Sequence, residues 1–127
     1  LITNGSQQGL EFLGRLLLSP VDTALVAAPT YLGALQAFSA CQPHYETLRL
    51  TDTNMNAEAY GQAAMAKGGR VGFAYVVPEF ANPTGETMTE AERLRLIDIA
   101  HELNTPIIED SPYTVDPVTR HRAVRRD

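Results

Sequence analysis

The sequence predicts an α/β fold in which a mostly parallel sheet lies between two layers of helices. Three observations support this prediction: short β-prone segments alternate with longer segments of helical periodicity, the strand-like segments are apolar, and polar motifs directly follow several of them. Such alternation is typical of parallel sheets whose strands are connected by covering helices. The expected architecture is therefore a three-layer α/β/α arrangement.

Four segments are predicted to form the strands of this sheet. They are rich in the apolar, β-branched and aromatic residues that favour extended structure, and they span residues 23–28, 44–50, 71–77 and 106–109. A further strand-like stretch, residues 1–3, opens the chain. Amphipathic stretches separate these segments, as the predicted fold requires.

Four helices are expected between the strands. Helical spacing of apolar residues places the first two, through Leu10, Leu13 and Leu17 in one and Tyr31, Leu35 and Phe38 in the other. A weaker, alanine-rich helix over residues 56–66 stops at Gly68-Gly69, because a residue without a Cβ permits the left-handed turn that ends helices.

The clearest helix is the last one, which begins at Thr89. Thr89 and Glu92 have the spacing of a capping box, in which each residue satisfies a free N–H group of the first turn. The apolar residues that follow at i, i+3, i+4 and i+7 form one buried face, made of Leu96, Ile99, Ala100 and Leu103.

The composition predicts a soluble globular protein. The 127 residues are 44% apolar and 20% charged, with a formal net charge of −5, and no apolar run approaches the roughly 18 residues that a membrane span needs. Cys41 is the only cysteine, and the three histidines share no ligand spacing, so neither a disulfide framework nor a metal site is expected. We expect a cytoplasmic protein with no membrane segment and no bound metal.

A basic segment, residues 120–127, contrasts with the acidic remainder of the chain. It holds four arginines and one aspartate. A short basic run without interleaved aromatic residues is more often solvated than bound to nucleic acid. We therefore expect no nucleic-acid partner.

A motif near the start of the chain suggests a phosphate site. In Gly5-Ser6-Gln7-Gln8, several backbone N–H groups and the Ser6 hydroxyl would point outward from the positive N-terminus of the first helix. The alternative is that Ser6 only caps this helix.

Two further motifs follow predicted strands, at the edge where open α/β sheets bind ligands. Asn82-Pro83-Thr84-Gly85 would present the Asn82 amide there, although the same residues also make a tight turn without any function. Asp110 directly follows Ile107-Ile108-Glu109, and a buried carboxylate needs a partner such as a cationic ring nitrogen. The alternative is an exposed turn aspartate.

Two tyrosines also lie after predicted strands. Tyr31 follows Ala28-Pro29-Thr30 and could stack its ring on a planar cofactor, or it could be a core aromatic residue in the first turn of a helix. Tyr113 could aim its hydroxyl into the same crevice as Asp110 or pack its ring.

Taken in order, Gly5-Ser6-Gln7-Gln8, Pro29-Thr30-Tyr31, Asn82-Pro83-Thr84-Gly85 and Asp110-Ser111-Pro112-Tyr113 resemble the large domain of class I/II aminotransferases, the fold-type I pyridoxal-phosphate enzymes. The resemblance covers about residues 1–113 and is nearest to aminotransferases of the 2-aminoadipate or aromatic type. It implies an incomplete fold-type I large domain over residues 1–113, followed by an irregular tail over residues 114–127.

The resemblance also implies a role for each matching residue. In pyridoxal 5'-phosphate, the phosphate would be held by Ser6 and Gln7, and the ring face would stack against Tyr31. The phenolic oxygen would be held by Asn82 and Tyr113. The pyridine nitrogen would pair with Asp110. A carboxylate beside that nitrogen keeps the ring protonated, which lets it act as an electron sink. The implied substrates are an amino acid and a 2-oxo acid, and the implied assembly of the intact parent is a homodimer.

No residue of this chain matches the Schiff-base lysine of the family. That lysine follows the strand that bears the aspartate, whereas Lys67, the only lysine of the chain, precedes Asn82 and lies beside Gly68-Gly69. We therefore expect no catalytic residue in the chain and no activity of the chain alone.

Val21 is a further departure from the family pattern, since glycine usually precedes the aspartate of this turn.

An alternative parent is a transcription regulator that joins a winged-helix module to an aminotransferase-like effector domain.

Overall fold

The computed structural model describes residues 6–27, 32–77 and 87–110, apart from the side chain of Ser6. A parallel sheet forms the centre of this part of the chain, with the strands in the order β2-β1-β3-β4. These strands are β1 (Thr23–Ala27), β2 (His44–Leu48), β3 (Val71–Val76) and β4 (Ile107–Glu109). Each lies within one or two residues of a predicted strand, so the predicted parallel sheet is confirmed.

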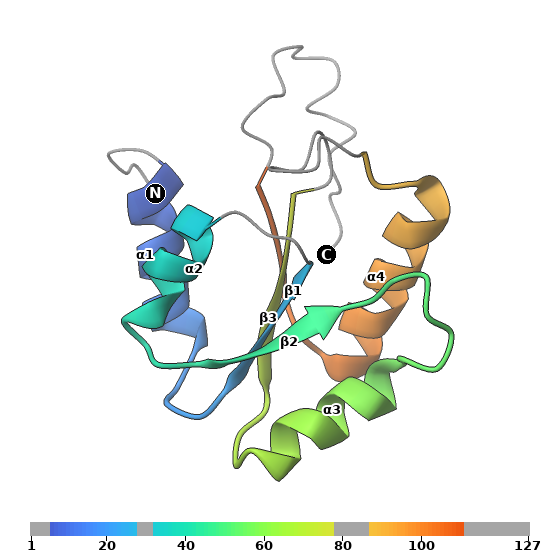
Figure 1. The fold of residues 1–127 in the computed structure, drawn as a ribbon, viewed down its shortest axis with the longest axis horizontal. Coiled ribbons are helices and arrows are strands. Elements are labelled where there is room, and N and C mark those ends of the chain that lie inside the picture. The colour runs from blue at the N-terminus through green and yellow to red at the C-terminus, as the bar shows by residue number, and fades with distance from the viewer. Residues whose placement is uncertain (1–5, 28–31, 78–86, 111–127) are drawn as a thin grey trace.

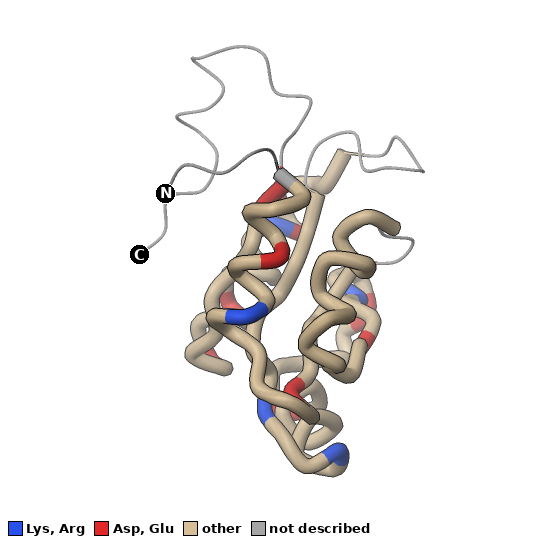
Figure 2. The backbone as a smooth tube through the Cα atoms, turned by 90° about the vertical axis from the view of Figure 1, so that its left-hand side faces the viewer, with Lys and Arg blue, Asp and Glu red and all other residues tan. Residues whose placement is uncertain are grey.

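Helices cover both faces of the sheet, as Figure 1 shows. They are α1 (Ser6–Leu17), α2 (Leu32–Ser39), α3 (Ala57–Ala66) and α4 (Glu90–Leu103). The α1 and α2 helices lie side by side on one face, while α3 and α4 pack on the other (Figures 1 and 2). The three-layer α/β/α prediction is thus confirmed.

Within the described residues, no helix has both the length and the apolar character needed to cross a membrane.

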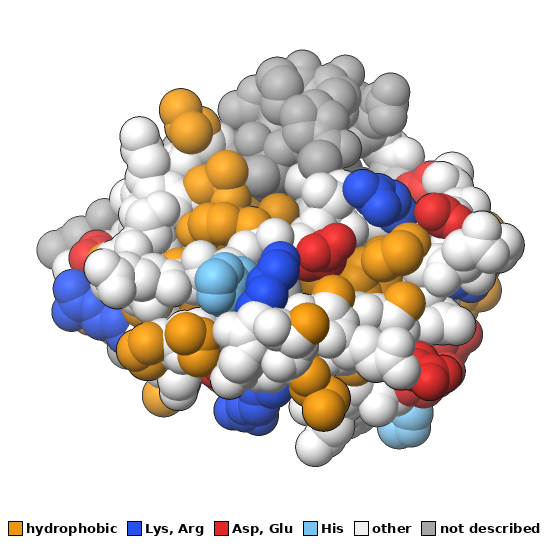
Figure 3. All heavy atoms as spheres, turned by 60° about the horizontal axis from the view of Figure 1, so that its bottom comes forward, with side chains coloured by type: hydrophobic (Ala, Val, Ile, Leu, Met, Phe, Trp, Pro, Cys, Tyr) orange, Lys and Arg blue, Asp and Glu red, His pale blue; other side chains and the backbone are white. Residues whose placement is uncertain are grey.

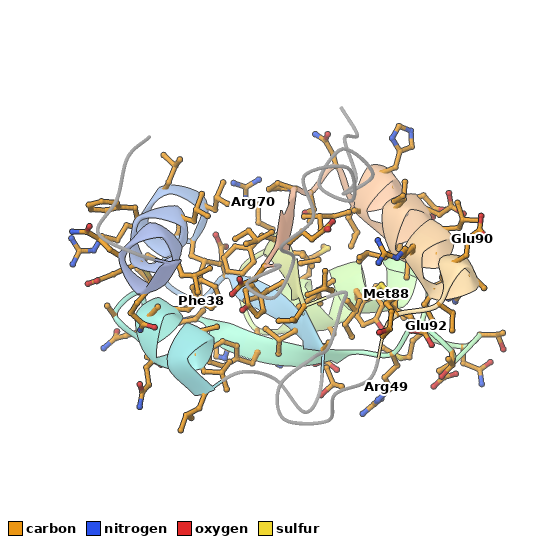
Figure 4. All side chains as sticks on the ribbon, turned by 90° about the horizontal axis from the view of Figure 1, so that it is seen from above. Phe38, Arg49, Arg70, Met88, Glu90 and Glu92 are labelled. Atoms are coloured by element: carbon orange, nitrogen blue, oxygen red, sulfur yellow. The ribbon has the colours of Figure 1, made fainter. Side chains whose placement is uncertain are left out.

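Alternating side chains of β3 belong to two separate hydrophobic clusters, one on each face of the sheet. Phe73 and Tyr75 face α1 and α2, whereas Ala74 and Val76 face α3 and α4. Phe38 of α2 points toward the sheet (Figure 4) and holds its ring 4.8 Å from that of Phe73 and 5.5 Å from that of Tyr75. Tilted and edge-to-face contacts at these separations are favourable for aromatic rings, so they fix the orientation of Tyr75.

The helix ends follow the sequence signals. Thr89 is the N-cap of α4, and its Oγ1 accepts a hydrogen bond from the backbone N–H of Glu92 at 3.1 Å. Asn56 caps α3 in the same way, accepting from the N–H of Ala59 at 2.9 Å. Gly68 has a φ of +93° just after α3, as expected for a glycine that ends a helix through a left-handed turn.

The carboxyl ends of the strands and the amino ends of α1, α2 and α4 lie at the same end of the molecule, which is the top of Figure 1. The sequence predicts its ligand site at this end, because open parallel sheets bind ligands outside the carboxyl ends of their strands.

Candidate functional site

Asp110 is attached to β3 through both its backbone and its side chain. Its N–H donates to the carbonyl oxygen of Val76 at 3.0 Å, and its Oδ2 accepts a hydrogen bond from the hydroxyl of Tyr75 at 2.8 Å. The residue is partly buried at the carboxyl end of β4. The structure therefore favours the interpretation of Asp110 as a hydrogen-bonded, partly buried carboxylate and not as an exposed turn aspartate.

The carboxylate of Asp110 belongs to the side of the sheet that α1 and α2 cover. Ile108 and Tyr75 both contribute to the hydrophobic cluster beneath these two helices. Because side chains alternate along a strand, Asp110 continues the face of Ile108, and the hydroxyl of Tyr75 reaches it there. The start of α1, which bears the predicted phosphate motif, lies on this same side of the sheet (Figure 1).

The starts of α1 and α2 are joined by the side chain of Gln7. Its Nε2 donates to the carbonyl oxygen of Gly33 at 2.9 Å, so this amide hydrogen bond ties the first turn of α1 to the first turn of α2. The structure places Gln7 where the sequence predicts a phosphate site, at the N-terminus of a helix.

The first turns of the helices differ between the two faces of the sheet. Those of α1 and α2 contain no acidic residue, whereas α3 has Glu58 there and α4 has Glu90 and Glu92. Acidic side chains complement the partial positive charge of a helix N-terminus. The starts of α1 and α2, on the same side of the sheet as the Asp110 carboxylate, lack this complement from their first turns, which suits the binding of an anion.

Several predicted site residues lie outside the described part of the chain. These are Tyr31, Asn82 and Tyr113, together with the side chain of Ser6, whose backbone begins α1. The roles expected for them stay predictions.

Tyr75 is a residue of the candidate site that the sequence pattern did not predict. It is fully buried, and its position in an apolar strand gives it the pattern of a core residue. A signal was nevertheless present, because a phenol hydroxyl in a buried strand needs a hydrogen-bond partner, and Tyr75 lies close to the carboxyl end of β3.

Lys67 lies away from the carboxyl ends of the strands. It is the C-cap of α3, four residues before β3 begins, and its Nζ forms an ion pair with Glu46 Oε2 at 3.4 Å. This placement puts Lys67 near the amino end of β3, away from the candidate site. Figure 3 shows the lower face of the molecule, where charged side chains of both signs are scattered among apolar ones.

A groove runs along the other face of the sheet, between α4 and the edge strand β4. Met88, Leu96, His101 and Ile107 are among its lining residues, and α4 begins beside it with Met88 pointing inward (Figure 4). In the described ranges, no group of three or more His, Cys, Asp or Glu residues could hold a metal ion. The groove lies on the face of the sheet opposite to the one that Tyr75 and Ile108 share with α1 and α2.

The fold is that of an open parallel α/β protein, and its candidate site lies at the carboxyl ends of the strands. The sequence model of aminotransferase class I and II matches residues 1–115. The chain therefore belongs to the class I and II aminotransferase family.

Named relatives place it within the family. It is 41% identical over 114 residues to aromatic-amino-acid aminotransferase 1 of Thermococcus litoralis, an alignment that covers 87% of this chain and 27% of that relative. It is 34% identical over 113 residues to the 2-aminoadipate transaminase of Thermus thermophilus, covering 89% and 28% respectively. It is also 31% identical over 113 residues to an uncharacterized HTH-type transcriptional regulator of Bacillus subtilis, covering 89% and 23%.

A solved structure supports the same assignment. The kynurenine aminotransferase of Pyrococcus horikoshii, determined in complex with PMP, superposes with a TM-score of 0.73 at 40% identity. The match covers 91% of this chain and 30% of that one. The chain thus spans less than a third of the length of these relatives, and pyridoxal phosphate is the cofactor that the family implies.

Proposed function

We propose that this chain is the cofactor-holding part of a pyridoxal-phosphate-dependent aminotransferase whose parent transfers an amino group between an amino acid and a 2-oxo acid. The observation that supports this most is the carboxylate of Asp110, held by Tyr75 and by the backbone of Val76 at the end of β4. A negative charge fixed at the ligand edge of the sheet is what a cationic ring nitrogen requires.

In this proposal, each site residue binds a different part of the cofactor. Asp110 accepts a hydrogen bond from the pyridine nitrogen and favours its protonated state, while the N-terminus of α1, with Ser6 and Gln7, holds the phosphate. Tyr31 stacks on the ring, and Asn82 and Tyr113 hydrogen-bond the phenolic oxygen. When bound, the cofactor supplies an electron sink for the α-carbon of the amino acid.

The chain itself holds the cofactor without a covalent bond in this proposal. Lys67 is engaged with Glu46 and follows α3, away from the carboxyl ends of the strands. The 127 residues then comprise a partial cofactor-binding domain over residues 1–113 and an irregular tail over residues 114–127, and they lack catalytic activity on their own. The parent is a cytoplasmic homodimer.

A titration with pyridoxal phosphate followed by borohydride reduction tests this proposal. We expect saturable binding by the folded chain, seen as a change in cofactor absorbance, and no stable mass addition after reduction at stoichiometric cofactor. The matched control is Lys67→Arg, which should bind the cofactor as the unaltered chain does. A specific adduct on Lys67, or no binding by a chain whose circular dichroism shows it to be folded, would contradict the proposal.

An effector domain of a transcription regulator is the second candidate. The 31% identity to the Bacillus regulator favours it, since such a domain would bind the same cofactor. Sequencing the gene upstream of this segment distinguishes the two, because the regulator would carry a basic winged-helix module before Leu1 and the enzyme a short arm.

A further inference from the structure

We propose that Tyr75 is a positioning residue of the cofactor site, whose hydroxyl fixes the carboxylate of Asp110 so that its other oxygen is available to the ring nitrogen. The inference rests on the proposed function and adds to it a residue that does not touch the cofactor itself. It starts from the 2.8 Å hydrogen bond between Tyr75 Oη and Asp110 Oδ2.

The direction of this hydrogen bond follows from the chemistry of the two groups. An ionised carboxylate only accepts hydrogen bonds, and a phenol hydroxyl can donate one. Hydrogen bonds to an ionised partner are shorter and stronger than those between neutral groups. Because Tyr75 engages Oδ2, the described residues leave the oxygen Oδ1 to face a ligand.

The ring of Tyr75 is a rigid support for this hydrogen bond. The residue is 0% exposed, and its ring packs edge-on against Phe38, with 5.5 Å between centroids and an interplanar angle of 76°. Since the ring cannot turn without disturbing this cluster, the position of its hydroxyl is set by the core.

The backbone supplies a second restraint on the same carboxylate. Tyr75 pairs with Ile108, and Val76 pairs with Glu109, in the parallel register of β3 and β4. The N–H of Asp110 then continues this register by donating to the carbonyl oxygen of Val76 at 3.0 Å. With its backbone and one carboxylate oxygen both held by β3, Asp110 has little freedom to turn away from the site.

A matched pair of variants tests the role of Tyr75. Tyr75→Phe removes the hydroxyl and keeps the packed ring. Tyr45→Phe is the control, because the hydroxyl of Tyr45 also makes one hydrogen bond, to the carbonyl oxygen of Leu35 at 3.1 Å, away from Asp110. The probe is pyridoxamine phosphate, which has no aldehyde and so cannot react with Lys67.

Two readouts are followed with this probe, namely its dissociation constant and the protonation of its ¹⁵N-labelled ring nitrogen from the nitrogen chemical shift across a range of pH. We expect Tyr75→Phe to weaken binding by about tenfold, by analogy with metal sites, where loss of the outer hydrogen-bond partner of a ligating group costs about 10–100-fold in affinity. We also expect the ring nitrogen to lose its proton at lower pH, while Tyr45→Phe matches the unaltered chain in both readouts.

The opposite pattern would overturn the inference. If the hydroxyl of Tyr75 only withdrew charge from Asp110, its loss would strengthen binding of the protonated probe and would hold the proton on the ring nitrogen to higher pH. Unchanged affinity together with unchanged protonation would equally contradict a positioning role.

A double-mutant cycle separates this inference from the proposed function. In an Asp110→Asn background, Tyr75→Phe should have little further effect on affinity, because the two groups act as a unit. If the folded, unaltered chain fails to bind the probe, the proposed function fails. If that chain binds and Tyr75→Phe binds equally well, only the inference fails.

A measurement on the unaltered chain keeps the test decisive if Tyr75→Phe does not fold. The ¹³Cζ resonance of Tyr75 should shift when the probe binds, and that of Tyr45 should not. A Tyr75 resonance that stays fixed at saturation would contradict the inference.

Discussion

Val21 has a backbone conformation that is unfavourable for its β-branched side chain. Its φ is +71°, in a region that β-branched residues strongly disfavour. Pro20 precedes it, and the N–H of Asp22 donates to the carbonyl oxygen of Ser19 at 3.0 Å, which is the pattern of a type II turn with its glycine position occupied by valine. The family pattern, which has glycine here, is thus explained by the turn.

We therefore expect Val21→Gly to stabilise the protein by about 1 kcal/mol, because the left-handed conformation costs an L-residue roughly this much and glycine almost nothing. Val21 is 44% exposed, so little buried surface is lost. Urea denaturation measures the change. Thr51→Gly, at an exposed turn position without a positive φ, is the control and should destabilise. A decrease in stability for Val21→Gly would show that the turn does not strain valine.

Tyr60 predicts how stability depends on pH in the alkaline range. Burial raises the pKa of Tyr60 above its usual value of 10.0, and the backbone N–H of Arg49, which donates to its hydroxyl oxygen at 2.8 Å, partly opposes this rise in pKa. In the unfolded chain Tyr60 ionises near its usual pKa, whereas in the folded chain it keeps its proton to higher pH. Its contribution to stability is therefore complete below about pH 10 and is lost as the pH rises further.

Tyr60→Phe should remove this contribution. We expect the variant to lose about 1 kcal/mol at neutral pH, where the N–H of Arg49 loses its acceptor, and to show a shallower fall in stability above about pH 10. Urea denaturation of both proteins between about pH 8 and about pH 11 makes the comparison. Parallel curves would mean that Tyr60 ionises equally in the folded and unfolded states.

At the scale of elements, the contact between α1 and β3 depends on a glycine. A Cβ on Gly72 would lie 2.6 Å from Leu18 Cδ2 and 2.9 Å from the carbonyl oxygen of Leu17. The register between β1 and β3 also shifts at this point, between Thr23 and Ala24. The strand thus passes too close to the end of α1 for any side chain.

Gly72→Ala should accordingly destabilise the protein by about 1–3 kcal/mol, since the backbone carbonyl of Leu17 must move. Gly61→Ala in helix α3 is the matched control. The added Cβ would lie 3.4 Å from Cδ2 of Leu103, the nearest atom that it would meet among the described residues. That change should be neutral or should stabilise by up to about 1 kcal/mol. Thermal unfolding of both variants measures the difference, and equal midpoints would contradict the close packing of α1 on β3.

The elements themselves could be predicted from the sequence because their signals are local. The side chains of Thr89 and Asn56 each accept a hydrogen bond from the N–H group three residues later, so their capping roles are visible in a short segment. Strand ends were predicted less well: the strands beginning at Thr23 and His44 end at Ala27 and Leu48, one and two residues early. Pairing with a neighbouring strand decides where a strand ends, and that neighbour is distant in sequence.

At the scale of the whole molecule, the site was predicted only in part. Asp110 was predicted as a candidate because a buried carboxylate after an apolar strand needs a partner, whereas the hydrogen bond from Tyr75 was not predicted because the two residues lie 35 positions apart. The bond from Gln7 to Gly33 joins two helices across 26 residues and had no local signal either. Long-range hydrogen bonds of this kind depend on the order of strands in the sheet, which composition and periodicity do not determine.

We propose that the cofactor binds between the N-terminus of α1 and Asp110. A ¹H–¹⁵N correlation spectrum of the chain during titration with pyridoxamine phosphate tests this placement directly. We expect the largest shifts at the amides of Gln7, Gly33, Tyr75 and Asp110. Shifts confined to the groove between α4 and β4, at His101, Thr105 and Ile107, or no shifts from a folded chain, would contradict it.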